Sequence, residues 1–250
     1  MKLATQTLGQ GPDLFCIHGW GMNLAVWQPL VEVLQGDFRI TLVELPGHGA
    51  SPWEADCRTL DDWSSAVLAA APSRAIWCGW SLGGLIAQRA AALAPERLSV
   101  LVGLATTPCF VQKPDWPCAM EAAVLERFGA ELEADQARTL RRFLALQVQG
   151  SRNSRATLQL LRTEVEARPG ARAQALRTGL DLLLHTDLRD HPALDVPRRW
   201  ILGGRDQLVP LAPESRLPGR VHVIPGAGHA AFLSHREECA AVLREVAAGA

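Results

Sequence analysis

The sequence predicts an α/β fold in which a mostly parallel central sheet carries helices on both faces. Apolar runs without polar alternation are typical of strands that are buried on both faces, and such runs lie at residues 14–17, 40–43, 75–78, 100–104, 200–202 and 221–224. Amphipathic stretches at residues 61–71 and 82–94 have the spacing of helices. Strands that alternate with helices along the chain indicate a parallel sheet between helical layers.

A helical insertion interrupts this alternation. From residue 109 to residue 185 the strand pattern disappears and apolar side chains recur at helical spacing, until strands resume after Pro197. We therefore predict an α/β core formed by residues 1–108 and 186–250, and a helical lid insertion at residues 109–185. Because the insertion follows the end of a strand, we expect it to cover the carboxyl edge of the sheet, where α/β folds bind their ligands.

The composition argues against several classes of protein. The chain has 250 residues, a formal net charge of −1, 48% hydrophobic and 20% charged residues, which is typical of a globular protein and not of a broadly basic nucleic-acid binder. No apolar run reaches the roughly 18 residues of a membrane span, and the N-terminal segment lacks a signal-peptide pattern. The six cysteines lack the spacing of a metal site or a disulfide framework. We expect a cytoplasmic monomer without a metal or cofactor.

The segment Gly79-Trp80-Ser81-Leu82-Gly83 has the pattern G-x-S-x-G. It directly follows the apolar run 75–78 and opens the helical stretch that begins at Leu82. This strand–turn–helix setting is that of a nucleophile elbow, in which glycines permit a sharp turn and the serine hydroxyl stands above the sheet. The start of a helix also favours negative charge nearby. The sequence thus predicts that Ser81 is a nucleophile, and the alternative is a serine that only caps a helix.

A serine nucleophile needs a base that is oriented by a third group. In enzymes with this elbow, the acid and then the histidine come later in the chain. Asp206 and His229 follow the last two apolar runs, so we expect both to reach the edge of the sheet that carries Ser81. The competing candidates, which do not follow a strand end, are His235 for the base and Asp187, Asp190 and Asp195 for the acid.

The same chemistry needs backbone N–H groups that are directed at the developing oxyanion. One should be the N–H of Leu82, the residue after the nucleophile, and the other should come from the loop after the first apolar run, where we choose Trp20. We expect the Trp20 indole to line the acyl pocket. His18 in that loop could serve as a base, but its place before the serine conflicts with the chain order of the triad and favours a structural role.

Together these motifs resemble the α/β-hydrolase superfamily over nearly the whole chain. A closer resemblance is to the pimeloyl-acyl-carrier-protein methyl ester esterases of the biotin pathway. It rests on HGWG at 18–21, AIWCGWSLGG at 75–84, TPCF at 107–110, DWP at 115–117 and RFLALQ at 142–147. The first two segments are common to many hydrolases, whereas the other three make the resemblance specific.

The resemblance implies hydrolysis of the methyl ester at the far end of a pimeloyl chain that an acyl-carrier protein holds on its phosphopantetheine. It also implies an acyl tunnel lined by the insertion, and arginines on the insertion that meet the acidic carrier. The implied substrate-binding residues are Trp20, Ser81, Leu82, Phe143, Leu144, Ala145, Leu146, Gln147 and His229. The carrier-binding residues that the resemblance implies are Arg138 and Arg142, and the arginine pattern described below adds Arg152 and Arg155 as candidates. Without the resemblance, Phe143, Leu144 and Leu146 are equally typical of the insertion's own core.

Arginine is concentrated on the predicted insertion. Residues 138–177 contain nine arginines and only two acids, Glu164 and Glu166. Arginine is common throughout the chain, since all but two of its 25 basic residues are arginine, as a GC-rich genome would produce. Arginines spaced as 138–142 and 152–155 would share helix faces. A charge run is usually a solvated face, but this one also fits an acidic protein or a phosphate group, with binding that weakens in salt. Nucleic acid fits less well, because aromatic residues are not interleaved.

The residues alone allow three functions. The first is a serine esterase that acts on a carrier-bound methyl ester, and the second is a broad-specificity small-ester or C–C bond hydrolase with the same triad. The third is a noncatalytic protein of hydrolase fold, which the loss of a triad member would indicate; Ser81, Asp206 and His229 are all present.

Overall fold

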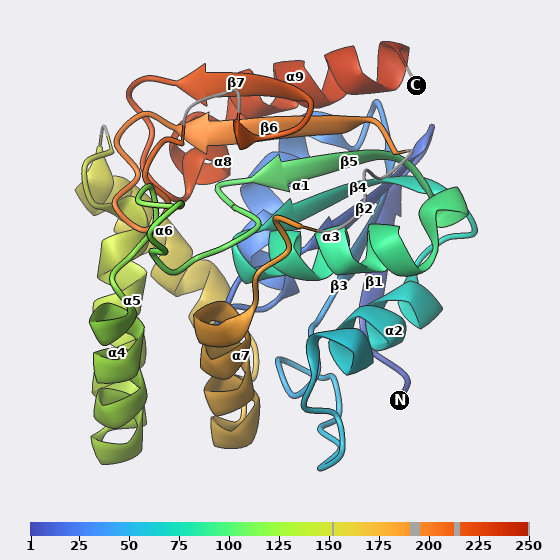
Figure 1. The fold of residues 1–250 in the computed structure, drawn as a ribbon. Coiled ribbons are helices and arrows are strands. Elements are labelled where there is room, and N and C mark those ends of the chain that lie inside the picture. The colour runs from blue at the N-terminus through green and yellow to red at the C-terminus, as the bar shows by residue number, and fades with distance from the viewer. Residues whose placement is uncertain (152, 191–195, 213–215, 250) are drawn as a thin grey trace.

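The computed structural model describes residues 1–151, 153–190, 196–212 and 216–249. These residues form a seven-stranded sheet in the order β1-β3-β2-β4-β5-β6-β7 (Figure 1). The strands are β1 (Thr5–Gly9), β2 (Asp13–Ile17), β3 (Arg39–Val43), β4 (Ala75–Trp80), β5 (Leu98–Leu104), β6 (Arg198–Gly203) and β7 (Arg220–Ile224). Among the described strands only β1 runs antiparallel to its neighbour, so the prediction of a mostly parallel sheet is confirmed.

The strand that the apolar runs did not predict is β1. It pairs with β3 at one edge of the sheet, and its side chains, from Thr5 to Gly9, alternate between exposed and half-buried. A strand at an edge needs no continuous apolar run, because it is not covered on both faces. Its place is fixed by the backbone ladder to β3, which a polar sequence can form as well as an apolar one.

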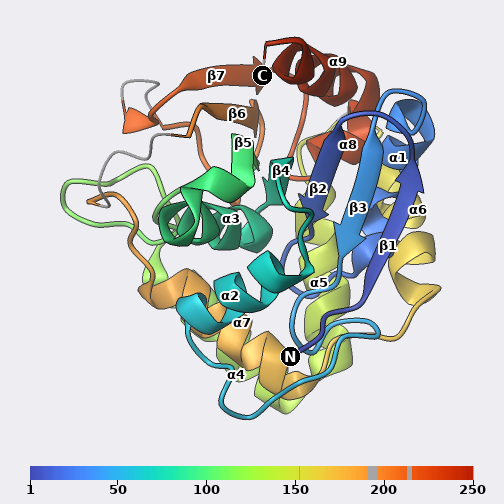
Figure 2. The ribbon, with the colours of Figure 1, turned by 90° about the vertical axis from the view of Figure 1, so that its right-hand side faces the viewer.

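Helices cover both faces of the sheet, as expected. The helices α1 (Gln28–Leu34), α8 (Ala231–Ser234) and α9 (Arg236–Ala248) pack together on one face, and α2 (Leu60–Ala70) and α3 (Leu82–Leu93) lie on the other (Figure 2). Two 3₁₀ turns, η1 (Leu24–Trp27) and η2 (Pro95–Arg97), complete the core. No helix in the described part of the chain is long and apolar enough to cross a lipid bilayer.

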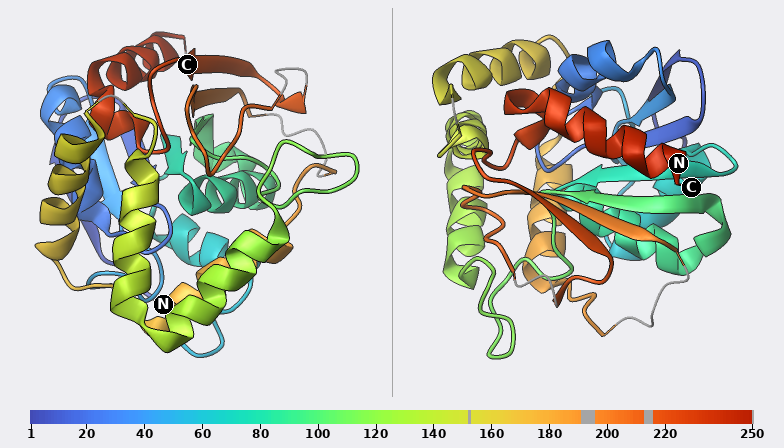
Figure 3. Two further views of the ribbon diagram at one scale, coloured as in Figure 1. Left: turned by 90° about the vertical axis from the view of Figure 1, so that its left-hand side faces the viewer. Right: turned by 90° about the horizontal axis from the view of Figure 1, so that it is seen from above.

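The segment predicted to be the insertion, residues 109–185, leaves the sheet after β5 and leads back to it at β6. Its helices are α4 (Ala122–Ala134), α5 (Gln136–Val148), α6 (Ser154–Glu166) and α7 (Ala173–His185), and they stand beyond the carboxyl ends of β5, β6 and β7 (Figures 1 and 3). The helices begin later than the expected residue 109, because residues 109–121 form turns that are joined by Val111–Met120 and Lys113–Trp116 bridges. Prolines at 114 and 117 disfavour a helix there.

Hydrogen bonds fasten the insertion to the loops of the core. The Trp20 indole Nε1 donates to the Leu176 carbonyl on α7 at 2.8 Å, and Asn23 Nδ2 donates to the Val165 carbonyl on α6 at 2.9 Å. These bonds start from the loop that follows β2. The insertion is thereby held over the edge of the sheet where the strands end.

Candidate active site

Ser81 lies in a sharp turn between β4 and α3, with φ 55° and ψ −120°. Residues that carry a side chain rarely adopt this conformation. The turn fits because its neighbours are glycines: a Cβ on Gly79 would lie 2.5 Å from the Gly83 carbonyl oxygen, and a Cβ on Gly83 would overlap the Ile17 carbonyl. The structure thus explains the G-x-S-x-G pattern by close packing of this turn against β2.

Thr106, which is not among the predicted site residues, also supports the elbow. Its Oγ1 donates to the Ser81 carbonyl oxygen at 2.7 Å, and its side chain occupies the space that a Cβ on Gly84 would need. The Ser81 N–H in turn donates to the Leu104 carbonyl at 3.0 Å. In the sequence, the position of Thr106 just after a predicted strand is the feature that could have indicated this role.

Asp206 and His229 meet, as expected from their places after β6 and β7. His229 Nδ1 lies 2.8 Å from Asp206 Oδ2, and each of the two side chains is only 1% exposed. The other carboxylate oxygen of Asp206 accepts hydrogen bonds from the N–H groups of Leu208 and Val209. Because the carboxylate accepts from Nδ1, the neutral imidazole keeps its lone pair on Nε2. That nitrogen is buried and has no hydrogen-bond partner among the described residues.

Trp80 joins the histidine to the serine. Its indole Nε1 donates to the His229 carbonyl at 3.0 Å, and its ring centroid lies 5.6 Å from that of the imidazole. Since Trp80 directly precedes Ser81, the contact places the imidazole beside the elbow.

The competing candidates have other surroundings. His235 precedes α9, and its Nδ1 lies 2.8 Å from the Ser234 hydroxyl. Asp187 forms an ion pair with Arg189 at 2.7 Å, Asp190 is exposed, and Asp195 lies outside the described residues.

His18 has both ring nitrogens engaged in the loop after β2. Its Nδ1 donates to the Gly19 carbonyl at 2.8 Å, which leaves Nε2 to accept from the Leu45 N–H at 3.1 Å. Burial, together with the nearby His48, lowers the pKa of His18 to about 3. A neutral histidine with two backbone partners braces this loop and has no free nitrogen for proton transfer.

The loop that was predicted to form the oxyanion hole lies against Ser81. A Cβ on Gly19 would come within 3.2 Å of the Ser81 Cβ. Leu82 is the first residue of α3, so its N–H has no acceptor within the helix. The Trp20 indole is fully buried, with its ring centroid 4.7 Å from that of Phe143 on α5 in an edge-on contact.

The predicted substrate segment, residues 143–147, lies on the C-terminal half of α5. Phe143 reaches Trp20, and the Gln147 carbonyl accepts a hydrogen bond from the Ala230 N–H at 3.0 Å, next to His229. Leu144 is buried, whereas Ala145 and Leu146 are half-buried. Phe143, at one end of the segment, thus contacts the loop after β2, and Gln147, at the other end, contacts the loop that carries His229.

Two of the predicted carrier-binding arginines, Arg138 and Arg142, are exposed on the N-terminal half of α5. With Glu131 and Asp135 they line a surface hollow of about 410 Å³. Arg142 is already paired with Glu131 at 2.6 Å, and its guanidinium lies 5.3 Å from the Phe128 ring centroid. Of the other two, Arg155 is exposed on α6, and Arg152 lies outside the described residues.

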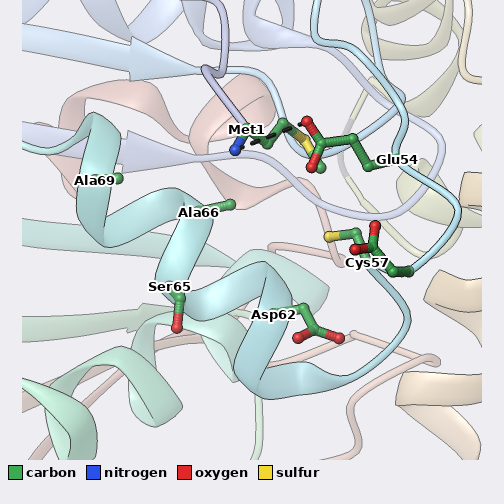
Figure 4. A pocket seen from close by; sticks show the side chains of 8 residues that line it. Met1, Glu54, Cys57, Asp62, Ser65, Ala66 and Ala69 are labelled. Atoms are coloured by element: carbon green, nitrogen blue, oxygen red, sulfur yellow. Dashed lines mark ion pairs between the residues drawn. The ribbon is translucent and has the colours of Figure 1, made fainter.

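A second hollow, of about 290 Å³, lies at the start of the chain against α2 (Figure 4). The Met1 amino group lies 3.8 Å from Glu54 there, and Cys57 and Asp62 face the same space. Burial and these acids raise the pKa of the Cys57 thiol to about 11, which keeps it protonated and unreactive. No group of three or more His, Cys, Asp or Glu residues in the described ranges is arranged to hold a metal ion.

Comparison with known proteins decides the family. A model described as the alpha/beta hydrolase family matches residues 14–242. The chain belongs to this alpha/beta hydrolase family. The esterase from Exiguobacterium antarcticum has the same fold, with a TM-score of 0.85 at 21% identity, over 96% of this chain and 93% of that one. The predicted fold class and the predicted class of enzyme, a hydrolase, are confirmed.

Within the alpha/beta hydrolase family, curated relatives match the chain from end to end. The pimeloyl-[acyl-carrier protein] methyl ester esterase of Stenotrophomonas maltophilia strain R551-3 is 46% identical, over 98% of this chain and 96% of the relative. The protein of the same name from Edwardsiella ictaluri is 44% identical, over 97% and 96%. The closer resemblance read from the motifs is therefore confirmed.

The two buried histidines His18 and His48 predict how the stability of the protein depends on pH. Burial lowers the pKa of His48 to about 4 from its ordinary 6.5, so the folded protein binds fewer protons than the unfolded chain below pH 6.5. The free energy of unfolding therefore decreases as the pH falls from 6.5 toward 4, by about 1.4 kcal/mol per pH unit for each such histidine. His48→Asn keeps an N–H donor for the Pro46 carbonyl and removes the titration.

Urea unfolding at pH 7 and pH 5 measures this difference. The native protein should lose about 2 kcal/mol more of its free energy of unfolding than His48→Asn does over this interval. The same loss in both proteins would contradict a neutral, buried His48.

Proposed function

We propose that this protein is a serine esterase that hydrolyses the methyl ester of pimeloyl-[acyl-carrier protein] to pimeloyl-[acyl-carrier protein] and methanol, in the synthesis of the biotin precursor. The buried Asp206–His229 hydrogen bond beside the Ser81 elbow is the observation that carries the reaction type. The substrate is supported by the relatives of 42–46% identity that bear this name.

In this proposal His229 is the general base and Asp206 holds it. Nε2 of His229 takes the proton of the Ser81 hydroxyl while Oγ attacks the ester carbonyl carbon. The carbonyl oxygen becomes an oxyanion, which the backbone N–H groups of Trp20 and Leu82 stabilise. Asp206 stabilises the imidazolium cation and fixes its orientation.

Three further proton transfers complete the reaction. The tetrahedral intermediate collapses and expels the methoxy group, which leaves as methanol with the proton from His229. A water molecule, deprotonated by His229, then attacks the acyl-serine ester, and collapse of the second intermediate returns the proton to Ser81. The products are the free carboxylate of the pimeloyl chain and the regenerated enzyme.

The insertion supports the choice of an acyl chain as substrate. Phe143 packs edge-on against Trp20, so α5 brings an apolar surface to the residue that we assign to the oxyanion hole. The proposed substrate-binding residues are those predicted from the sequence, namely Trp20, Ser81, Leu82, residues 143–147 and His229. The exposed arginines at 138, 142 and 155 are the proposed contacts of the acidic carrier, whose charge they complement.

We also propose that the enzyme acts as a monomer in the cytoplasm, with the carrier as its macromolecular partner. The six cysteines are all free thiols, five of them buried, which supports a reducing compartment.

Replacing the nucleophile tests the reaction type. Ser81→Ala removes the attacking oxygen and leaves the packing of the turn almost unchanged, so we expect hydrolysis of p-nitrophenyl butyrate to fall by at least about 10³-fold. The thermal unfolding midpoint should stay close to that of the native protein. Turnover that survives in a folded, pure Ser81→Ala protein would contradict the proposed mechanism.

Reversing one charge tests the carrier surface. Arg138→Glu is the sharper change, because Arg142 is already paired with Glu131. We expect KM for the carrier-linked ester to rise about fivefold to tenfold at low salt, with the difference shrinking as salt is added. Activity on p-nitrophenyl butyrate should not change.

The matched control for Arg138 is Arg74→Glu, at an exposed arginine before β4, at the opposite edge of the sheet from Ser81. It should leave KM for the carrier-linked ester unchanged. Equal effects of the two reversals, or equal loss on carrier-linked and small esters, would contradict docking at Arg138.

A further inference from the structure

The peptide groups on both sides of His229 are held by the insertion. The Gly228 N–H donates to the Ser151 hydroxyl oxygen at 3.1 Å, and the Ala230 N–H donates to the Gln147 carbonyl at 3.0 Å. The carbonyl of His229 itself is held by the Trp80 indole at 3.0 Å. The backbone of His229 is therefore held from two sides. Trp80 of the core holds it from the side of the elbow, and the corner between α5 and α6, residues 147–151, holds it from the other side.

This corner packs closely on the loops of both the histidine and the aspartate. A Cβ on Gly228 would lie 2.6 Å from Ser151 Oγ and 2.8 Å from the Gln149 carbonyl oxygen. Gly150 has a positive φ of 80°, and a Cβ there would lie 2.9 Å from the carbonyl oxygen of Arg205, the residue before Asp206. A glycine is thus required on each side of the contact, because only backbone without side chains can approach so closely.

We propose that Ser151 is a positioning residue for His229, an inference that rests on the proposed role of His229 as the base. The imidazole must direct its Nε2 lone pair at the Ser81 hydroxyl, and a displacement of about 1 Å in such a site can cost as much as 100-fold in rate. Asp206 fixes the ring through Nδ1, but a ring that moves with its backbone loses this alignment. The Ser151 hydroxyl anchors the peptide group on the N-terminal side of the histidine.

The same contact joins the base to the surface that we propose for the carrier. Arg138 and Arg142 stand on α5, and this helix ends at Val148, where the corner begins to contact the histidine loop. The corner that holds His229 is thus continuous with the helix on which we propose that the carrier docks.

The experiment compares Ser151→Ala with Ser151→Thr, which keeps the hydroxyl, and with Ser154→Ala as a control. Ser154 is an exposed serine at the start of α6, three residues further along the chain. The substrate is p-nitrophenyl butyrate, which does not need the carrier. Ser151→Ala should lower kcat about tenfold and leave KM within about twofold, while Ser151→Thr recovers most of kcat and Ser154→Ala matches the native enzyme.

Two further readouts separate positioning from a general loss of structure. The rate at which a fluorophosphonate labels Ser81 should fall with kcat in Ser151→Ala, because it reports activation of the nucleophile. Hydrogen exchange in a peptide covering residues 225–233 should accelerate about tenfold, while exchange in β4 and the thermal unfolding midpoint stay close to native values.

Unchanged kcat in Ser151→Ala would overturn the inference, and so would an equal loss in Ser154→Ala or no recovery in Ser151→Thr. These outcomes are distinct from failure of the proposed function. An enzyme that hydrolyses the small ester but not the carrier-linked one would refute the substrate and leave the role of Ser151 intact. An active Ser81→Ala protein would refute the triad itself.

Discussion

Ser81 holds a backbone conformation that costs a residue with a side chain about 1–3 kcal/mol, and the surrounding packing must offset that cost. The Leu104 carbonyl and the Thr106 hydroxyl bind the two backbone groups of the serine from the end of β5. The glycines beside it let the turn press against β2. The elbow therefore exists only where β2, β4 and β5 lie side by side, and the adjacent strands β6 and β7 then deliver Asp206 and His229 to the same edge.

The predicted insertion contacts the proposed site directly and does not only cover it. Its helix α7 accepts the Trp20 indole hydrogen bond and gives the ring room at Gly179, where a Cβ would come within 2.7 Å of the indole. Its helix α5 brings Phe143 to Trp20 at one point and holds the histidine loop at another. Both parts of the proposed machinery, the oxyanion loop and the base, are thus held by specific contacts with the insertion. A segment that only covered the site would not need these contacts.

Local sequence patterns predicted the parts of the site that are built locally. The strand, turn and helix around Ser81 are contiguous, and Asp206 and His229 each follow a strand within a few residues, so their meeting followed from the geometry of a parallel sheet. What the patterns missed depends on pairs that are distant in the chain. Ser151 and Gly228 are 77 residues apart, and nothing in either segment indicates the other. The edge strand β1 was missed because its ladder to β3, and not apolar burial, defines it. The excess of positive charge at residues 138–177 is also smaller in the folded structure than the sequence indicates. Helix α4 brings Glu131 to Arg142 and Glu133 to Arg177.

The proposed substrate can be tested by measuring methanol release from the methyl ester of pimeloyl-[acyl-carrier protein]. Carrier-linked methyl esters of shorter and longer chains and free short esters are measured beside it. We expect kcat/KM for the carrier-linked pimeloyl ester to exceed that for a free short methyl ester by about 100-fold or more, since carrier and acyl chain both contribute binding energy to the transition state. We also expect an optimum near the pimeloyl length. Equal kcat/KM for carrier-linked and free esters would contradict the proposed substrate and would identify a broad-specificity esterase with the same triad.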